Sequence, residues 1–356
     1  MIEINSNKLF TIDPYSLDLR DKEKIMIKIM EKLTDHHYIK SKYYKKLLNF
    51  LNLRKKKYKG LDDIPFLPVR LFKDFKLKSV NDDKVIKILQ SSGTTGLKTS
   101  KIFLDNKNSQ DQSKALNKIV KKLLGEERLP MLIIDKKPNQ KDRASINART
   151  AAINGFSIFG KDHLFLINDE NLIDYKNLNI FLEKYHQKKF LVFGFTSFIY
   201  QNLIQELLIN KISYSFKNAI LLHGGGWKKM EKIKITNEKF KYLLKKKLDL
   251  RKVHNYYGLV EQTGSIFIEC KCGYFVTSVF SDILIRDKNF NIVRNGSKGL
   301  IQLFSTLPSS YPGHSILTED IGQIISETKC NCSIKGKKFL VHGRIAEAEI
   351  RGCSDV

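Results

Sequence analysis

The chain has 356 residues, enough for a large hydrophobic core and about two domains. Its net charge is +26, from 63 lysine and arginine residues against 37 acidic residues. Most of these cations are lysines spread along the whole chain, whereas nucleic-acid readers favour arginine forks, so we expect a solvated basic surface and no specific nucleic-acid binding. Anionic ligands such as ATP, or a membrane surface that supplies fatty acids, fit the charge equally well.

No apolar run approaches the roughly 18 residues that a membrane-spanning helix needs, so no transmembrane segment is expected. The start, MIEINSNKLF, lacks the basic and apolar regions of a signal peptide. We therefore expect a cytoplasmic protein whose five cysteines stay reduced and are free for metal binding or catalysis.

The first predicted element is helical. Residues 18–56 carry apolar side chains at helical spacing with lysines on the other face. Residues 64–75 contain two prolines, which favours a loop or an extended crossing segment. Over residues 85–105 we expect a strand, a Gly/Ser/Thr-rich loop and a second strand, followed by an amphipathic helix over 108–124.

Short apolar strands follow at 131–135, 190–195 and 219–226, with helical stretches between them. This alternation predicts an α/β fold with a mainly parallel sheet flanked by helices. After about residue 264 the pattern becomes strand-rich, which indicates a smaller β-rich subdomain. There is no internal repeat, so we expect one large body with subdomains.

The segment SSGTTG is the sharpest local motif. Hydroxyl side chains and backbone N–H groups between glycines suit a polyphosphate cradle, because glycine lets the backbone approach the phosphate oxygens. Lys98 and Lys101 lie close enough in sequence to add charge. The motif is not a P-loop, and a hairpin loop without a ligand is the alternative. The candidate phosphate-binding residues are Ser91, Ser92, Gly93, Thr94, Thr95 and Gly96.

A second motif is HNYYGLVEQTG, residues 254–264. Tyr256 and Tyr257 offer flat faces on which a base could stack, and Gly258 follows them. Glu261 lies in a polar loop where its carboxylate could hold Mg²⁺. A buried tyrosine pair and a surface glutamate form the alternative interpretation.

HGGGW, residues 223–227, follows a predicted strand. Gly224 and Gly225 suit close approach of the backbone to a ligand, at the place where open α/β sheets bind ligands. The alternative is a tight turn packed by Trp227.

Two later segments, LTEDIG (317–322) and HGRIAEAEIRG (342–352), supply Asp320 and Arg344. An acidic side chain can accept hydrogen bonds from ribose hydroxyls, and an arginine can donate to ribose or phosphate. Each segment could equally be a surface turn.

Four cysteines form the close pairs CKC and CNC, about 60 residues apart. Such an arrangement predicts a structural Cys₄ zinc site without a catalytic role, although the C-x-C spacing is tighter than the usual C-x₂-C. Buried apolar cysteines or loop cysteines are the alternatives. The residues are Cys270, Cys272, Cys330 and Cys332.

Taken in their order, the motifs resemble the adenylate-forming superfamily of acyl-CoA synthetases, luciferases and peptide-synthetase adenylation domains. SSGTTG stands where that superfamily has its phosphate loop, and HGGG stands where its loop lines the adenine pocket. The resemblance implies that Tyr257 packs on adenine and that Glu261 meets Mg²⁺. It also places Asp320 and Arg344 on the ribose, although Glu319 replaces the glycine of the Thr-Gly-Asp-x-Gly motif.

Longer blocks resemble the bacterial acyl-protein synthetases, the LuxE family of long-chain-fatty-acid–protein ligases. These blocks are PFLPVRLFK (65–73), SSGTTG, PMLIID (130–135), FGFTSF (193–198), HGGGWKK (223–229), VHNYYGLVEQTGSIF (253–267), SYPGHSILTEDIG (310–322) and AEIRGCSDV (348–356). The resemblance implies an AMP-forming ligase that uses ATP, Mg²⁺ and a fatty acid, in luminescence or in another pathway. It implies an N-terminal helical region (1–60), an adenylate-forming core (61–342) and a C-terminal tail with an acyl-acceptor cysteine (343–356).

Two features depart from the wider superfamily. The proline that often follows the phosphate loop is missing, since the sequence reads TGLKTSK. The chain also ends where a superfamily member would continue, so we expect it to lack the usual C-terminal swinging domain and its catalytic lysine. Lys98, Lys101 and Arg344 are then candidates for the cation at the transferring α-phosphate.

The family resemblance implies that Cys353 receives the acyl group as a thioester. A free thiol is partly ionised at neutral pH and intrinsically nucleophilic. Arg351 would favour the thiolate, Asp355 would oppose it, and Gly352 would give the tail freedom to move. A surface cysteine on a disordered end is the alternative.

An acyl-accepting partner protein, a fatty-acid reductase or an acyltransferase, would then collect the acyl group. Three other functions stay open. They are an acyl- or aryl-CoA ligase similar to phenylacetate–CoA ligase, adenylation with transfer to a carrier protein, and a noncatalytic nucleotide- or RNA-binding module.

Overall fold

The computed structural model describes residues 6–55, 57–91, 98–138, 145–227, 235–325 and 330–345. Contacts within the chain divide it into two units. The first unit comprises Met1–Ser91, Lys98–Leu123 and Tyr257–Glu349, and the second comprises Ser92–Leu97, Leu124–Tyr256 and Ile350–Val356. Cys353 and the loop residues Ser92, Gly93, Thr94, Thr95 and Gly96 lie outside the described residues.

The first unit is built on an antiparallel sheet whose strands lie in the order β12-β13-β14-β15-β11-β10. Strand β1 pairs with β14 in parallel, and β2 pairs with β3 as an antiparallel hairpin. The elements of this unit are η1 (Ser6–Phe10), α1 (Leu19–Lys40), α2 (Lys42–Phe50), η2 (Leu61–Asp63), β1 (Leu67–Pro68), α3 (Leu71–Asp74), η3 (Asp82–Lys84), β2 (Lys87–Gln90), β3 (Lys101–Leu104), α4 (Asn106–Leu124), η6 (Val260–Gln262), β10 (Phe267–Glu269), β11 (Phe275–Val276), β12 (Ser281–Arg286), β13 (Lys298–Ser305), β14 (Ser315–Ile325) and β15 (Lys338–Arg344).

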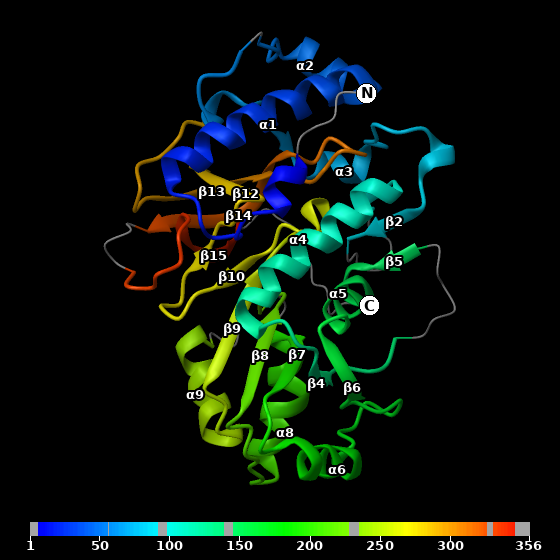
Figure 1. Ribbon diagram of the computed structural model, residues 1–356, viewed down its shortest axis with the longest axis vertical. Helices are drawn as coiled ribbons and strands as arrows, with labels where there is room; N and C mark the ends of the chain where they lie inside the picture. The colour runs from blue at the N-terminus through cyan, green and yellow to red at the C-terminus, as the bar shows by residue number, and fades with distance from the viewer. Residues whose placement is uncertain are drawn as a thin grey trace. The chain divides into compact units, whose positions relative to one another are not determined.

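The second unit is built on five parallel strands in the order β9-β8-β7-β4-β6, as Figure 1 shows. This sheet and its helices confirm the predicted α/β class with a mainly parallel sheet. The elements are β4 (Leu129–Ile134), β5 (Ser145–Asn147), α5 (Ala148–Ser157), β6 (Gly160–Phe165), α6 (Tyr175–Tyr185), β7 (Phe190–Phe195), α7 (Thr196–Ile199), the π-helical turn η4 (Tyr200–Ile204), α8 (Gln205–Ile209), β8 (Ala219–Gly224), α9 (Asn237–Leu248) and β9 (Lys252–Tyr257).

Helices cover both faces of the parallel sheet, which explains why its central strands are uniformly apolar. Every residue of β4, β7 and β8 is buried. Alternate β7 side chains point to opposite faces: Phe190 and Val192 belong to a core cluster with α6, η4, α8 and α9. Phe193 on the other face packs against Phe156 of α5, with ring centroids 4.7 Å apart. The apolar runs in the sequence are therefore the doubly covered strands.

The N-terminal helical region is interrupted, so the expectation of helix throughout residues 18–56 is wrong in detail. Asp18 caps α1 by accepting from the Asp21 N–H at 2.9 Å. Ser41 is extended, with φ −111° and ψ 109°, and it separates α1 from α2. Beyond α2 the apolar periodicity ends at the exposed Phe50, and a lysine-rich stretch offers no face for a helix to bury.

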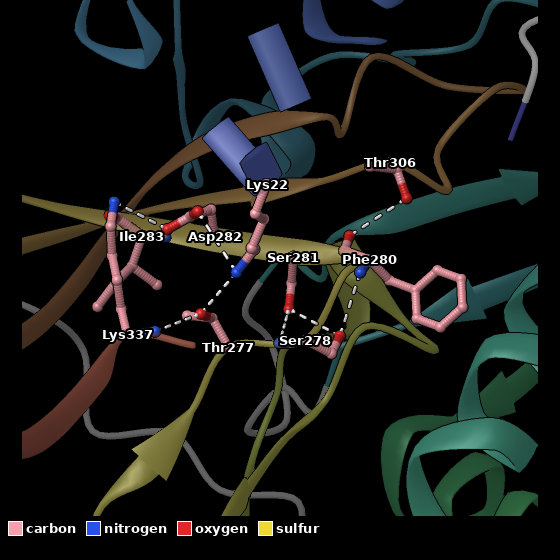
Figure 2. Close-up of polar contacts among 9 residues, drawn as sticks. All are labelled: Lys22, Thr277, Ser278, Phe280, Ser281, Asp282, Ile283, Thr306 and Lys337. Atoms are coloured by element: carbon pink, nitrogen blue, oxygen red, sulfur yellow. Dashed lines mark hydrogen bonds and ion pairs between the residues drawn. The ribbon is translucent and has the colours of Figure 1, made fainter. Parts of the chain in front are cut away.

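A buried charge cluster attaches α1 to the antiparallel sheet, and Figure 2 shows its side chains converging on Asp282 of β12. Lys22 of α1 lies 3.4 Å from one Asp282 carboxylate oxygen and donates to Thr277 Oγ1 at 2.6 Å. Lys337 approaches the other oxygen at 2.9 Å. Burial would raise the pKa of Asp282, but the two ammonium groups lower it overall. Burial lowers the pKa of Lys22 to about 8, with Asp282 opposing that shift.

His37 on the buried side of α1 stacks on the buried His314, with ring centroids 5.0 Å apart. His37 Nε2 lies 3.1 Å from the Pro308 carbonyl, which can only accept, so this nitrogen carries the proton and Nδ1 accepts from Ser79. His314 Nε2 lies 3.0 Å from Thr34 Oγ1. Burial lowers the pKa of His314 to about 3, and that of His37 well below its ordinary value, with charge repulsion from neighbouring histidines adding to both shifts.

We expect acid to destabilise the first unit through this histidine pair. Both folded-state pKa values lie below the unfolded value near 6.5, so their stabilising contribution is complete above pH 6.5 and is lost as pH falls from 6.5 towards 3. At pH 4.5 His314 alone should cost about 3 kcal/mol, because pH 4.5 lies two units below the unfolded pKa and each unit is worth about 1.4 kcal/mol. Thermal unfolding from pH 8 to 4.5 measures this loss.

The matching controls are His314→Gln, which should flatten the pH dependence of the unfolding temperature, and His163→Gln, which should leave it unchanged because His163 is exposed. An unfolding temperature that does not change between pH 7 and pH 4.5 would contradict the prediction.

Among the described residues, no helix combines the length and apolar character that crossing a bilayer requires.

Candidate active site

The β2–β3 hairpin holds both ends of the predicted phosphate loop. The Ser91 N–H donates to the Ser100 carbonyl at 3.1 Å, and the Ser100 N–H donates to Ser91 Oγ at 2.9 Å. Ser91 is therefore a structural part of the loop stem, while residues 92–97 between the two serines are outside the described part. Of the two candidate lysines, Lys98 is 77% exposed and lies 3.6 Å from Asp74, and Lys101 begins β3 with an exposed side chain.

Glu261 lies in η6, and its side chain is 5% exposed. The Tyr311 hydroxyl donates to the Glu261 carbonyl at 2.9 Å and fixes this turn. Burial raises the pKa of the Glu261 carboxyl, and the nearby Ser100 hydroxyl, Arg344 and Lys73 partly offset that rise. The carboxyl is thus shielded from water and faces a hydroxyl and two cations within one unit.

Ser100 itself was not singled out by the sequence. Its hydroxyl is buried, and its interaction with the Glu261 carboxyl lowers the pKa of that carboxyl. A buried hydroxyl next to a buried carboxyl is an environment that phosphate oxygens and a hydrated Mg²⁺ would suit. The donor set at Glu261 therefore fits the predicted metal. The only signal in the sequence is the position of Ser100 at the far end of the glycine-rich loop.

Asp320 and Arg344 lie directly opposite one another on β14 and β15. Arg344 Nε donates to one Asp320 carboxylate oxygen at 3.2 Å, and the Tyr257 hydroxyl donates to the other at 2.6 Å. Thr318 Oγ1, which sequence reasoning missed, accepts from the Asp320 N–H at 3.1 Å. The structure thus brings three of the predicted nucleotide-binding residues into one hydrogen-bonded group.

The Tyr257 ring is part of the core of the first unit. Its centroid lies 6.0 Å from Phe267, 6.0 Å from Phe275 and 6.2 Å from Phe339. Burial and Asp320 together raise the pKa of Tyr257 well above its ordinary value, so its hydroxyl stays a donor. In this arrangement Tyr257 holds Asp320 in place, and its stacking on adenine stays a prediction.

In the second unit, Gly224 and Tyr256 are in close contact. A Cβ on Gly224 would lie 2.5 Å from the Tyr256 ring, so only glycine fits here. The Tyr256 ring also packs against Phe156, with centroids 4.9 Å apart. Gly225 follows with φ 82°, which a side chain would strain. Gly258 belongs to the first unit, where it packs on Ile266.

His223 orders the end of β8. Thr196 Oγ1 donates its one proton to the Gly224 carbonyl at 3.0 Å, so His223 Nδ1, 2.8 Å from the same oxygen, must be the donor of that pair. Its Nε2 is buried and has no partner among the described residues. Burial lowers the pKa of His223 to about 3. Trp227 packs edge-on against Phe240, with ring centroids 5.4 Å apart.

The four predicted metal ligands meet in the first unit. The sulfur atoms of Cys270, Cys272, Cys330 and Cys332 all lie within 4.8 Å of one another. The first and third are buried, and the other two are partly exposed.

A cavity of about 620 Å³ opens in the second unit at the amino ends of β4 and β6. It is lined largely by charged side chains, among them Arg128, Lys161 and Lys188. None of the predicted site residues contributes to it, so this cavity does not mark the candidate active site.

A family model described as acyl-protein synthetase, LuxE, matches residues 2–356. A curated relative, the long-chain-fatty-acid–luciferin-component ligase of Aliivibrio fischeri, is 23% identical over 363 residues, which cover 97% of this chain and 91% of the relative.

The fold is similar to those of solved ligases. An open conformation of 2-hydroxyisobutyryl-CoA ligase in complex with 2-HIB-AMP and CoA has a TM-score of 0.73 at 10% identity, over 94% of this chain and 77% of that chain. A long-chain-fatty-acid-CoA ligase from Archaeoglobus fulgidus has a TM-score of 0.50 at 13% identity, over 75% of this chain and 53% of that chain. At these identities the likeness is one of fold.

Proposed function

Since the chain belongs to the LuxE acyl-protein synthetase family and is an AMP-forming fatty-acid ligase, we propose that it carries the activated acyl group on its own Cys353. In the first step a fatty-acid carboxylate oxygen attacks the α-phosphorus of ATP, and the bond to pyrophosphate breaks. In the second step the Cys353 thiolate attacks the acyl carbon and AMP leaves. A partner of the reductase or acyltransferase type then removes the acyl group.

The observation that carries this proposal is the buried Glu261 carboxyl beside the buried Ser100 hydroxyl at the stem of the phosphate loop. Phosphoryl chemistry depends on neutralising charge that develops on the leaving pyrophosphate. Mg²⁺ held by Glu261 would supply that neutralisation. Ser100 and the loop residues would donate to phosphate oxygens, while Lys98, Lys101 and Arg344 are candidate cations for the α-phosphate.

Asp320 and Arg344 are proposed to hold the ribose. The Asp320 carboxylate accepts from Tyr257 and Arg344, and its two oxygens offer about four acceptor positions in all. Two positions therefore remain for ribose hydroxyls without breaking the existing group. Tyr257 keeps the carboxylate oriented and Thr318 holds the Asp320 main chain before the nucleotide binds, which lowers the entropy cost of binding.

The glycine turn after β8 is proposed to contribute to the adenine site from the second unit. Tyr256 presents its ring against Gly224, and Gly225 keeps the following backbone free of a side chain. A flat base could therefore approach the main chain at Gly225. The proposed roles of Tyr257 and Gly258, in the first unit, rest on the motif alone.

The proposal is tested by incubating the purified full chain with ATP, Mg²⁺ and a mixture of fatty acids. We expect fatty-acid-dependent release of pyrophosphate and a gain in intact mass equal to one acyl group, which hydroxylamine removes. Absence of fatty-acid-dependent pyrophosphate release would contradict the adenylation. Pyrophosphate release with acyl transfer only to added CoA or a carrier protein would contradict the role of Cys353.

A further inference from the structure

We propose that the four clustered cysteines bind one zinc ion, which ties the β10–β11 hairpin to the segment that leads into β15. Tetrahedral Zn²⁺ with Zn–S bonds near 2.3 Å separates its sulfur ligands by about 3.8 Å. The Cys270 and Cys330 sulfurs are 3.8 Å apart, and all four sulfurs lie within 4.8 Å of one another. The sulfur–sulfur distances would have to change by up to about 1 Å to give a regular tetrahedral thiolate site.

Disulfides do not explain the same cluster. A disulfide has an S–S distance near 2.05 Å, whereas Cys330 and Cys332 lie 3.0 Å apart and all four are free thiols. Each pair is also separated by one residue only, which is unfavourable geometry for a bridge within the pair. The contacts that the thiols make instead are weak, since a thiol is only a weak hydrogen-bond donor: Cys330 faces Cys332, and Cys272 donates to Asn331 Oδ1 at 3.1 Å.

The surroundings have the features of a structural metal site. The Cys270 N–H donates to the Tyr274 carbonyl at 2.8 Å, and the Gly273 N–H donates back to the Cys270 carbonyl at 2.9 Å, forming a tight turn. Gly273 has φ 84°, which lets the chain fold back over the ligands. The ammonium of Lys338 lies near Cys332 and would offset part of the charge of a four-thiolate site.

The topology shows what the metal would do. Strands β10 and β11 have only three and two residues, too few for a stable hairpin by themselves. Strand β11 pairs with the start of β15 through Phe275–Phe339 and Val276–Lys338. A zinc ion shared by the hairpin and by Cys330 and Cys332 would replace the core that such short strands cannot supply. Strand β15 spans about 20 Å, with Lys338 at the end that pairs with β11 and Arg344 at the other end. A zinc ion near the first end would therefore lie far from Arg344, which gives it a structural and not a catalytic role.

The test is the metal content of the full chain, purified under reducing conditions and measured by elemental mass spectrometry. We expect one zinc per chain. Co²⁺ substitution should give the absorption of a tetrahedral four-thiolate site. Cys272→Ser and Cys332→Ser each remove one of the two partly exposed ligands. Mutating a residue that only hydrogen-bonds to a metal ligand lowers metal affinity by roughly 10- to 100-fold, so the loss of a ligand itself should lower zinc affinity by more than that. Cys353→Ser is the matched control and should retain one zinc.

If the ligand variants fail to fold, the wild-type chain answers the question alone. Zinc is removed with a chelator, its release is followed with a metal dye, and Zn²⁺ is titrated back while the unfolding temperature is measured. Stoichiometric rebinding with a raised unfolding temperature supports the site. A chain that holds no zinc before or after titration, that binds iron instead, or whose mass shows two disulfides would overturn it. None of these readouts depends on acyl transfer, so the zinc site and the proposed function fail separately.

Discussion

Replacing Cys353 with serine is expected to abolish the hydroxylamine-labile acyl group on the protein while fatty-acid-dependent formation of acyl-adenylate continues. A cysteine thiol is partly ionised at neutral pH, whereas a serine hydroxyl is not, so serine lacks the nucleophile that displaces AMP. Without an acceptor the adenylate should accumulate, and pyrophosphate release should stop after about one equivalent per active site. Rapid-quench measurement of pyrophosphate together with intact mass separates the two steps.

Ser354→Ala is the matched control for this experiment, because it alters the neighbouring residue and leaves the thiol. It should be acylated like the wild-type chain. A Cys353→Ser protein that still gains a hydroxylamine-labile acyl group would show that another thiol is the acceptor, and the proposal for Cys353 would then be wrong.

Replacing Glu261 with glutamine is expected to lower kcat/KM for fatty-acid-dependent pyrophosphate release by about 100- to 1,000-fold, the size expected when a preorganised electrostatic group is lost. Glutamine keeps the shape of the side chain but removes the charge that would hold Mg²⁺. Because burial raises the pKa of Glu261, removing its charge should leave the unfolding temperature unchanged or higher. Steady-state kinetics over a range of Mg²⁺ concentrations measures the effect.

Glu269→Gln supplies the comparison, since Glu269 is another buried glutamate of the same unit, on β10. It should keep the Mg²⁺ dependence and most of the rate of the wild-type chain. Equal rates for Glu261→Gln and wild type at every Mg²⁺ concentration would exclude Glu261 as the metal ligand.

The sequence predicted the second unit best. Uninterrupted apolar runs such as FLVFGF are typical of strands covered on both faces, and β4, β7 and β8 have that environment. The N-terminal region was predicted less well. Its periodicity indicated helix but did not reveal the extended Ser41, since the spacing of apolar side chains is nearly unchanged across one non-helical residue.

The candidate site was also predicted only in part. Motif order placed Asp320 and Arg344 together in function, and the register of β14 and β15 places them opposite one another. Ser100 was not singled out because a single hydroxyl residue has no distinctive spacing, and Thr318, although it stands in the LTEDIG segment, was given no role of its own. The domain bounds and the roles of the individual site residues stay predictions.

The sequence by itself determined the family, the α/β class and the order of the nucleotide motifs, because these depend on residue type and on local spacing. Only the tertiary structure decided which groups lose contact with water and which meet. It buried Glu261 beside Ser100, enclosed Lys22 with Asp282, and brought two cysteine pairs about 60 residues apart within 4.8 Å. Burial and pairing are set by long-range packing, and the pKa values and metal affinity of these groups follow from their surroundings rather than from their neighbours along the chain.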